Sequence, residues 1–342
     1  MADNDLSNYA NGDLVEIEQA IKNISETTCR TLVYIDQLNS PPKLMEIVKT
    51  KTGIKQILLA DYIEQNSCDP AVLLHVLSQV FQPKQTGRRG LIFWSHGTGW
   101  FPSSILFTRS IGIDTETGDS SVPNMIDIIQ LSDVLSYFPP FDFIAFDACF
   151  MGSVEVAYEL KNHCQVMIAS PAEIMADGFD YIKGYKYLAT TNYSPTKFIQ
   201  TTYQYYLSSQ TPYAALSVIK TEALEELAMS YSRLVSEYGR KAQAGIPHFD
   251  RNSTNYFYDF GFMINSYPES KYRSSVLKAF NNVIQSEYHT SELIDADISG
   301  TSGLSIYLPS VLTEKVNTEY KKFEWYKCCS LLLGDEYFKT IY

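Results

Sequence analysis

The chain has 342 residues, a length that allows a large buried core and favours two domains over one. With 45% hydrophobic and 19% charged residues, its composition is that of an ordinary globular protein. The net charge of −12 disfavours nucleic acid and anionic membranes as partners, because both attract chiefly Lys and Arg. No apolar run in the sequence reaches the length of a membrane span. The sequence leaves the oligomeric state open, and we favour a monomer.

The six cysteines and five histidines show no metal-ligand spacing. Asp3, Asp5 and Ser7 begin a pattern like that of a calcium loop. Its twelfth position is Leu14, however, where a bidentate Glu is required. The residues themselves therefore predict no metal ion and no other cofactor.

In the first third of the chain, apolar periodicity predicts alternating helices and strands. The expected elements are a helix over Leu6–Cys29, strands over Thr31–Ile35 and Gln56–Ala60, and a helix over Asp69–Phe81. Asp69 is expected to cap the last of these helices, with Pro70 at its first position. Lys43–Lys55 stays open, with an edge strand as one interpretation.

Two short apolar runs end in residues that can perform chemistry. Leu91–Trp94 is followed by Ser95-His96-Gly97, and Phe143–Phe146 is followed by Asp147-Ala148-Cys149. Short apolar runs bounded in this way are typical of buried strands. A helix is expected soon after Cys149, and a thiol just before a helix N-terminus is biased toward the thiolate.

The spacing of the two runs predicts that they are neighbours. Met125–Tyr137 has helical periodicity and can form the crossover of a βαβ unit between them. Two adjacent parallel strands would then present the His96 imidazole and the Cys149 thiol side by side, at the edge where open α/β sheets bind ligands. A cysteine hydrolase requires this pair, since the base keeps the sulfur ionised and then protonates the leaving group.

The rest of the chain completes the sheet and then changes in composition. The expected elements are a strand at Gln165–Ser170, an acidic loop at Pro171–Tyr181 that carries Glu173, Asp177 and Asp180, a helix at Ser194–Gln210, a last sheet strand at Tyr213–Ile219 and a helix at Thr221–Ala242. Gly245–Asn255 is interpreted as a linker. A smaller α+β domain follows, with a helix near Tyr272–Tyr288, a strand at Leu304–Leu308 and a closing helix near Thr313–Leu333. The predicted domains are 1–244 and 245–342.

With these residues identified, the chain resembles the clostripain family of cysteine peptidases, which belongs to the clan of caspases, legumains and gingipains. The matching motifs are His96-Gly97-x-Gly99-Trp100 after its strand, FDFIAFDACFMGSVEVAYEL around Cys149, SPAEIMADGFDY at Ser170–Tyr181, ADNDLSNYA at Ala2–Ala10 and SGLSIYLP at Ser302–Pro309. Together they span nearly the whole chain in the order found in the family.

The resemblance implies a caspase-like α/β/α sandwich with a mostly parallel central sheet and a His96–Cys149 dyad. The backbone N–H groups of Gly97 and Cys149 are implied to bind the oxyanion. Cleavage after Arg or Lys is also implied, with Asp147 and Asp177 at the positions of the family's pocket carboxylates. Two such carboxylates would favour a bidentate guanidinium over an ammonium.

The resemblance carries further expectations about maturation and location. Some relatives are matured by a cut between His and Cys, so self-cleavage at Arg109-Ser110, in the 102–123 loop, is a hypothesis. Some relatives need calcium, but no calcium site is identified. Relatives are commonly exported, which implies secretion or the bacterial cell envelope, although the sequence shows no signal peptide. Relatives also carry an apolar strand just before the ADND motif, so either residues precede Met1 or the sheet lacks a strand.

Simpler interpretations stay open for single residues. Cys149 could be a buried structural cysteine, Asp147 a strand-end cap, and Asp177 one half of a common Asp-Gly turn. The favoured function is a cysteine endopeptidase that cleaves peptide or protein substrates after Arg or Lys. One alternative is a catalytically inactive caspase-like module that binds basic peptides. Another is a dyad peptidase with specificity for Asp or Asn.

Overall fold

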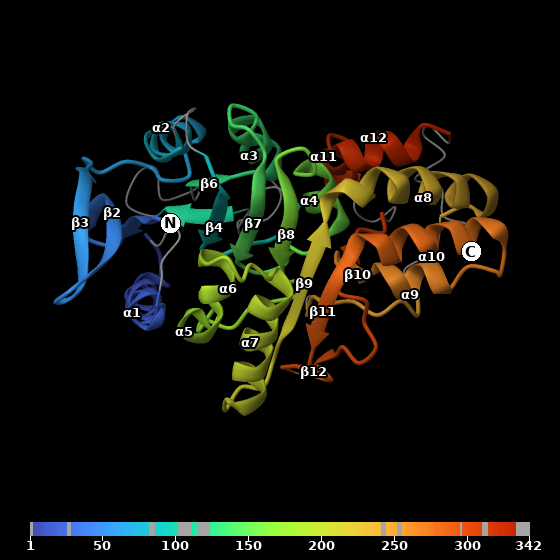
Figure 1. Cartoon of the computed structure of the whole chain (residues 1–342). Coiled ribbons are helices and arrows are strands. Elements are labelled where there is room, and N and C mark those ends of the chain that lie inside the picture. The colour runs from blue at the N-terminus through green and yellow to red at the C-terminus, as the bar shows by residue number, and fades with distance from the viewer. Residues whose placement is uncertain are drawn as a thin grey trace.

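The structure is a computed structural model that describes residues 3–25, 29–81, 86–101, 111–114, 124–240, 244–251, 255–294, 296–309 and 314–332. A five-stranded sheet runs through its centre in the order β11-β9-β8-β7-β4 (Figure 1). The strands are β4 (Gly90–Trp94), β7 (Phe141–Asp147), β8 (Cys164–Ala169), β9 (Ala215–Lys220) and β11 (Ile284–His289). Since β4, β7 and β8 are parallel and β9 is antiparallel to both β8 and β11, four of the five strands point the same way. The predicted α/β class with a mostly parallel sheet is confirmed.

Alternating side chains of the buried strands build a core on each face of the sheet. From β7, Phe143 and Ala145 face one core, and Ile144 and Phe146 face the other. The first core is covered by α1 (Ser7–Asn23), α5 (Tyr181–Gly184), α6 (Lys186–Ala189) and α7 (Pro195–Ser208). The second is covered by α2 (Pro70–Val80), α3 (Ile128–Leu135), α4 (Val154–Glu159) and α8 (Leu224–Tyr238), which follows the short 3-10 turn η1 (Thr221–Ala223).

Side-chain caps fix the first residues of two predicted helices, α2 and α3. Asp69 accepts hydrogen bonds from the backbone N–H groups of Ala71 and Val72 at the start of α2, as predicted. The crossover helix α3 begins three residues later than expected, because Asn124–Ile126 forms β6 and pairs with β5 (Ile111–Asp114). Asp127 and Gln130 then form a capping box that fixes the start of α3.

A second sheet of three antiparallel strands lies beside β4, with its outer strand β3 at one end of the molecule (Figure 1). It consists of β1 (Thr31–Gln37), β2 (Ser40–Thr50) and β3 (Gly53–Asp61), so the open stretch Lys43–Lys55 resolves into strand, turn and strand. β4 is the outer strand of the described central sheet. A cavity of about 690 Å³ lies between the two sheets and is lined by successive residues of β1 and β4, Thr31–Ile35 and Gly90–Trp94.

The central sheet does not end at β9, and the prediction that Tyr213–Ile219 is its last strand was wrong. The helix expected near Tyr272–Tyr288 ends earlier, as α10 (Lys271–Val283), and the chain continues as β11 along the edge of β9. Pairing with an open strand edge outweighs the local helical pattern over Ile284–His289. The division into domains 1–244 and 245–342 stays a prediction, and contacts across it are extensive, since β11 joins the sheet and α10 packs on α8.

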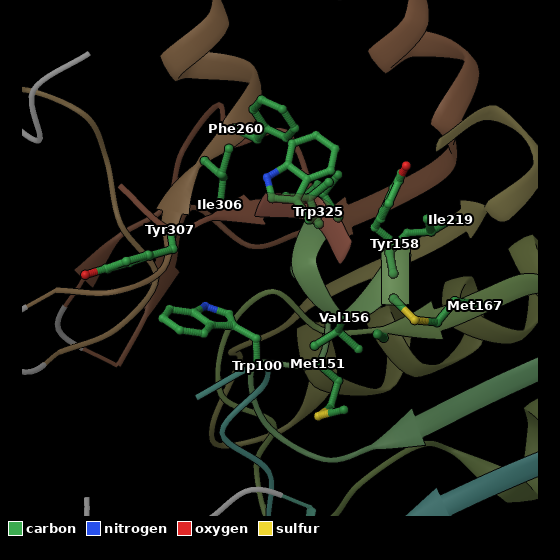
Figure 2. Close-up of a cluster of buried hydrophobic side chains, with 14 of the residues drawn as sticks. Trp100, Met151, Val156, Tyr158, Met167, Ile219, Phe260, Ile306, Tyr307 and Trp325 are labelled. Atoms are coloured by element: carbon green, nitrogen blue, oxygen red, sulfur yellow. The ribbon is translucent and has the colours of Figure 1, made fainter. Parts of the chain in front are cut away.

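The C-terminal elements cover one end of the second core. They are β10 (Tyr258–Asp259), α9 (Phe260–Asn265), β12 (Glu292–Leu293), β13 (Ala296–Asp297), β14 (Ser305–Ile306), α11 (Glu314–Tyr320) and α12 (Glu324–Ser330). Figure 2 shows the buried cluster beneath them, where Trp325 lies near Phe260 and Tyr158. Trp100 is 1% exposed and packs on Tyr307, so it serves loop packing. No helix in the described part of the chain is both long and apolar enough to cross a membrane.

Candidate active site

The parallel pairing of β4 with β7 brings His96 and Cys149 to the same edge of the sheet. Trp94 lies opposite Asp147 in the register, and the Ser95 N–H donates to the Asp147 carbonyl oxygen over 3.3 Å. His96 and Cys149 each follow two residues after this register pair. The two side chains thus leave neighbouring strands at the same level, in the arrangement that the strand pattern predicted.

The backbones of the two turns touch at Gly97. A Cβ atom at this position would lie 2.6 Å from the Cys149 carbonyl oxygen and 3.2 Å from the Cys149 nitrogen. The 2.6 Å contact is shorter than real Cβ atoms make, so only glycine permits this approach. The same approach sets the peptide of Gly97 beside that of Cys149, the two groups implied to bind an oxyanion.

The Cys149 sulfur is held by the backbone of a third segment. The Ile174 N–H donates to the sulfur over 3.4 Å, and the thiol lies 3.7 Å from the Ile174 carbonyl oxygen. The helix expected after Cys149 is α4, which begins at Val154 with Ser153 as its N-cap and is six residues long. The N–H group that can stabilise a thiolate here belongs to Ile174.

Glu155 lies in the first turn of α4. It is fully buried and accepts hydrogen bonds from the Tyr307 N–H and the Tyr320 hydroxyl. Burial raises the pKa of its carboxyl group to about 7. Glu155 therefore ties α4 to the C-terminal elements.

Asp147 lies beneath the candidate site as a buried carboxyl group. It is 4% exposed and accepts hydrogen bonds from the Phe179 N–H over 3.0 Å and from the Tyr181 hydroxyl over 2.9 Å. Burial outweighs these two donors and raises the pKa of Asp147 to about 6. Gly178 closes over it, since a Cβ there would lie 2.7 Å from Asp147 Oδ2.

The acidic loop after β8 places its three carboxylates in three different roles. Asp177 is exposed and accepts a hydrogen bond from the Tyr205 hydroxyl over 3.1 Å. Asp180 caps α5 by accepting a hydrogen bond from the Lys183 N–H. Glu173 accepts two hydrogen bonds from the guanidinium of Arg251.

Helix α1 contributes two carboxyl groups that the sequence did not single out. Asp13 hydrogen-bonds Trp94, and burial together with the nearby charges of Asp147 and Glu16 raises its pKa to about 8. Burial also raises the pKa of Glu16, which accepts a hydrogen bond from the Tyr181 N–H. The sequence contains one signal for the position of Asp13: this acidic residue directly precedes the apolar stripe of the helix, which starts at Leu14. Asp13 is thus a protonated neighbour of Asp147 at neutral pH.

Arg109 and Ser110, the self-cleavage candidates, lie outside the described residues. Within the described ranges, no group of three or more His, Cys, Asp or Glu side chains is arranged to hold a metal ion. The described residues thus offer no cluster of three carboxylates that could hold calcium.

A mostly parallel sheet between two helical layers, with His and Cys at the ends of neighbouring strands, defines a protein of the caspase-like class. A family model described as the clostripain family matches residues 1–327. The chain therefore belongs to the clostripain family, and the resemblance read from its motifs is confirmed.

Individual relatives agree with this assignment. The chain is 28% identical to clostripain from Hathewaya histolytica over 140 residues, which are 39% of this chain and only 27% of clostripain. It is 28% identical to an inactive zymogen C11 protease from Parabacteroides distasonis, with a TM-score of 0.84 over 96% of this chain and 95% of that one. A secreted C11 cysteine protease from Bacteroides thetaiotaomicron, solved with an irreversible peptide inhibitor, is also 28% identical, with a TM-score of 0.82 over 96% of both chains.

Proposed function

We propose that this chain is a cysteine endopeptidase that cleaves peptide bonds after Arg or Lys, with Cys149 as nucleophile and His96 as general acid and base. The observation that carries the proposal is the parallel register of β4 and β7, which sets both side chains two residues beyond Trp94 and Asp147. Membership of the clostripain family and the inhibitor-bound relative support it.

In the first half of the reaction, the thiol proton of Cys149 passes to the His96 imidazole. The thiolate then attacks the substrate carbonyl carbon, and the carbonyl oxygen becomes an oxyanion. The N–H groups of Gly97 and Cys149 donate to that oxygen, in a role that needs no side chain and fits the close backbone contact at Gly97. As the C–N bond breaks, the imidazolium gives its proton to the leaving amine nitrogen.

In the second half, water resolves the thioester that links the substrate acyl group to Cys149. Neutral His96 takes a proton from the attacking water, and the oxygen of that water bonds to the carbonyl carbon. The C–S bond breaks as the oxyanion collapses, and the sulfur recovers a proton from His96. The products are a new carboxyl group after the Arg or Lys and the free thiol, so atoms and protons balance.

Specificity for Arg or Lys is proposed to come from Asp147 and Asp177. Asp147 is buried beside the cysteine turn, and Asp177 lies on the loop that closes over it. Both charges also act on Asp13, which supports their lying in one acidic region. Burial of Asp147 strengthens its attraction for a cation that enters without its water, and a guanidinium can donate to both carboxyl groups.

Two further properties belong to the same proposal. Self-processing after Arg109 would follow from the proposed preference, because the residue is basic and lies between His96 and Cys149 in the sequence. Intact mass measured over time, with Arg109→Ala as control, tests it, and an uncut active wild type counts against it. Export is proposed because the relative from Bacteroides thetaiotaomicron is described as secreted.

Hydrolysis of arginyl, lysyl and aspartyl fluorogenic amides, with Cys149→Ala as control, tests the main proposal. We expect turnover of the two basic substrates by the wild type and none by the variant. Turnover of the aspartyl amide alone would support the dyad and reject the acidic pocket. If no amide is turned over, even after limited trypsin treatment, the chain is better described as a module that binds basic peptides.

A further inference from the structure

His96 has a carboxylate partner from the beginning of the chain. Asp5 Oδ1 lies 2.6 Å from His96 Nε2, although 91 residues separate the two in sequence. This distance is slightly shorter than the usual range of about 2.7–2.9 Å for a hydrogen bond from nitrogen to a carboxylate, so the two groups are in direct contact. The His96 side chain is 11% exposed and that of Asp5 is 73% exposed, so the carboxylate reaches a largely enclosed ring from the solvent side.

The turn that carries Asp5 is fixed from both sides. Asn4 is 2% exposed, its side chain accepts a hydrogen bond from the Leu6 N–H over 2.9 Å, and its carbonyl oxygen accepts one from the Ser7 N–H over 3.0 Å. Ser7 is in turn bonded to Gln37 and Leu38 at the turn between β1 and β2. The exposed carboxylate therefore projects from a backbone that is held in place.

The contact also defines which ring nitrogen carries a proton. An ionised carboxylate can only accept hydrogen bonds, so Nε2 must be the donor to Asp5. In the neutral ring, Nδ1 then has the lone pair. A proton from a thiol can be taken only by that nitrogen.

We propose that Asp5 is a positioning residue for His96, which holds the ring so that Nδ1 exchanges the proton with Cys149 and stabilises the imidazolium that results. This inference rests on the proposed dyad. The thiol proton moves to Nδ1 and later to the leaving amine, the Nε2 proton stays in place, and Asp5 remains ionised throughout. An amide at position 5 could offer an N–H to Nε2 and favour the wrong tautomer.

The test compares the wild type with Asp5→Asn, Asp5→Glu and Asp61→Asn. Asp61 is an exposed carboxylate on β3 and controls for the loss of one charge. For Asp5→Asn with an arginyl amide, we expect kcat to fall about tenfold, a modest effect because the pair is partly exposed. We expect KM to stay within roughly twofold, since the substrate-binding groups are intact. Asp5→Glu should recover part of the loss, and Asp61→Asn should match the wild type.

A second readout is independent of substrate. Iodoacetamide alkylates thiolates, so the rate at Cys149 near pH 7, followed by peptide mass, should fall in Asp5→Asn, while the rate at exposed Cys29 stays constant. Unchanged alkylation of Cys149 and unchanged kcat would overturn the role of Asp5. Parallel changes in kcat, KM and melting temperature would also overturn it, in favour of a structural role. Slower alkylation in a protein that hydrolyses no amide would uphold the positioning and reject the proposed substrate.

Discussion

The two halves of the candidate site are held together by different kinds of structure. The His96–Cys149 edge depends on two neighbouring strands, and its geometry follows from one parallel register. The acidic region draws Asp13 from α1, Asp147 from the end of β7 and Asp177 from the loop after β8. The first half is therefore fixed by backbone hydrogen bonds, and the second by burial and by side chains from distant segments.

From this difference we expect the strand edge to govern the rate of the reaction and the acidic region to govern the choice of substrate. Changes at the strand edge should affect kcat for every substrate, because they act on groups that we propose take part in the reaction itself. Changes in the acidic region should affect KM for basic substrates and leave the chemistry intact.

Gly97→Ala should have the largest effect, because its Cβ would lie 2.6 Å from the Cys149 carbonyl oxygen and push the two turns apart. We expect a roughly 100-fold or greater fall in kcat for all substrates, the size of an effect on an oxyanion site. Gly12→Ala is the matched control, since a Cβ there meets nothing within 4 Å. If Gly97→Ala retains activity, the close approach of the Gly97 and Cys149 backbones is not needed for catalysis, contrary to the proposal.

Asp147→Asn tests the acidic half. The amide oxygen can still accept from the Phe179 N–H and the Tyr181 hydroxyl, so the fold should survive. We expect KM for an arginyl amide to rise about 10- to 100-fold, the loss of one hydrogen bond between charged groups, with kcat little changed. Asp133→Asn, an exposed carboxylate on α3, serves as control. A fall in kcat with constant KM would mean that Asp147 acts on the chemical step and not on substrate binding.

The pH dependence of KM sharpens the same contrast. Burial raises the pKa of Asp147 to about 6, so the free enzyme holds this carboxyl group protonated below that pH. A cationic substrate binds the ionised form, and KM should therefore rise as pH falls through 6, toward about tenfold per pH unit. Steady-state kinetics from pH 4.5 to 8 would measure it. The rise in KM at low pH should vanish in Asp147→Asn. If the rise persists in this variant, another titrating group causes it.

Asp13→Asn should have the smallest effect on activity. With its pKa raised to about 8, Asp13 is mostly neutral at pH 7, and an amide replaces it closely. We expect kcat/KM for basic substrates at pH 7 to stay within roughly twofold.

Stability supplies a second test of the same group. Because the folded-state pKa of Asp13 lies above its unfolded value, ionisation of the unfolded chain lowers the free energy of unfolding as pH rises from about 4 to 8. The melting temperature of Asp13→Asn should therefore exceed that of the wild type at pH 8 and match it near pH 4. A melting temperature unchanged at pH 8 would contradict the raised pKa of this carboxyl group.

The sequence predicted the strand edge because both of its parts are local. An apolar run that ends in His96 and another that ends in Cys149 already contain the strand, the turn and the reactive group. The contact of Cys149 with Ile174 and that of His96 with Asp5 join segments far apart in the chain, and no local pattern contains them.

The central sheet also contains one strand that local sequence patterns could not predict. β7 and β8 could be read from buried apolar runs, whereas β11 carries mixed polar residues and is a strand only because β9 offers an open edge. Asp13 and Glu16 look like ordinary polar residues of an amphipathic helix until α1 packs beside Asp147. Position in the tertiary structure, not residue type, gives these groups their altered pKa values.

Covalent labelling with peptidyl electrophiles is the most direct test that Cys149 is the nucleophile beside an acidic pocket. The wild type would be treated with an arginyl and an aspartyl inhibitor of equal reactivity, and the modified cysteine identified by peptide mass. We predict one adduct, on Cys149, formed faster by the arginyl reagent and absent from Cys149→Ala. Labelling of another cysteine, or equal rates for the two reagents, would contradict the account.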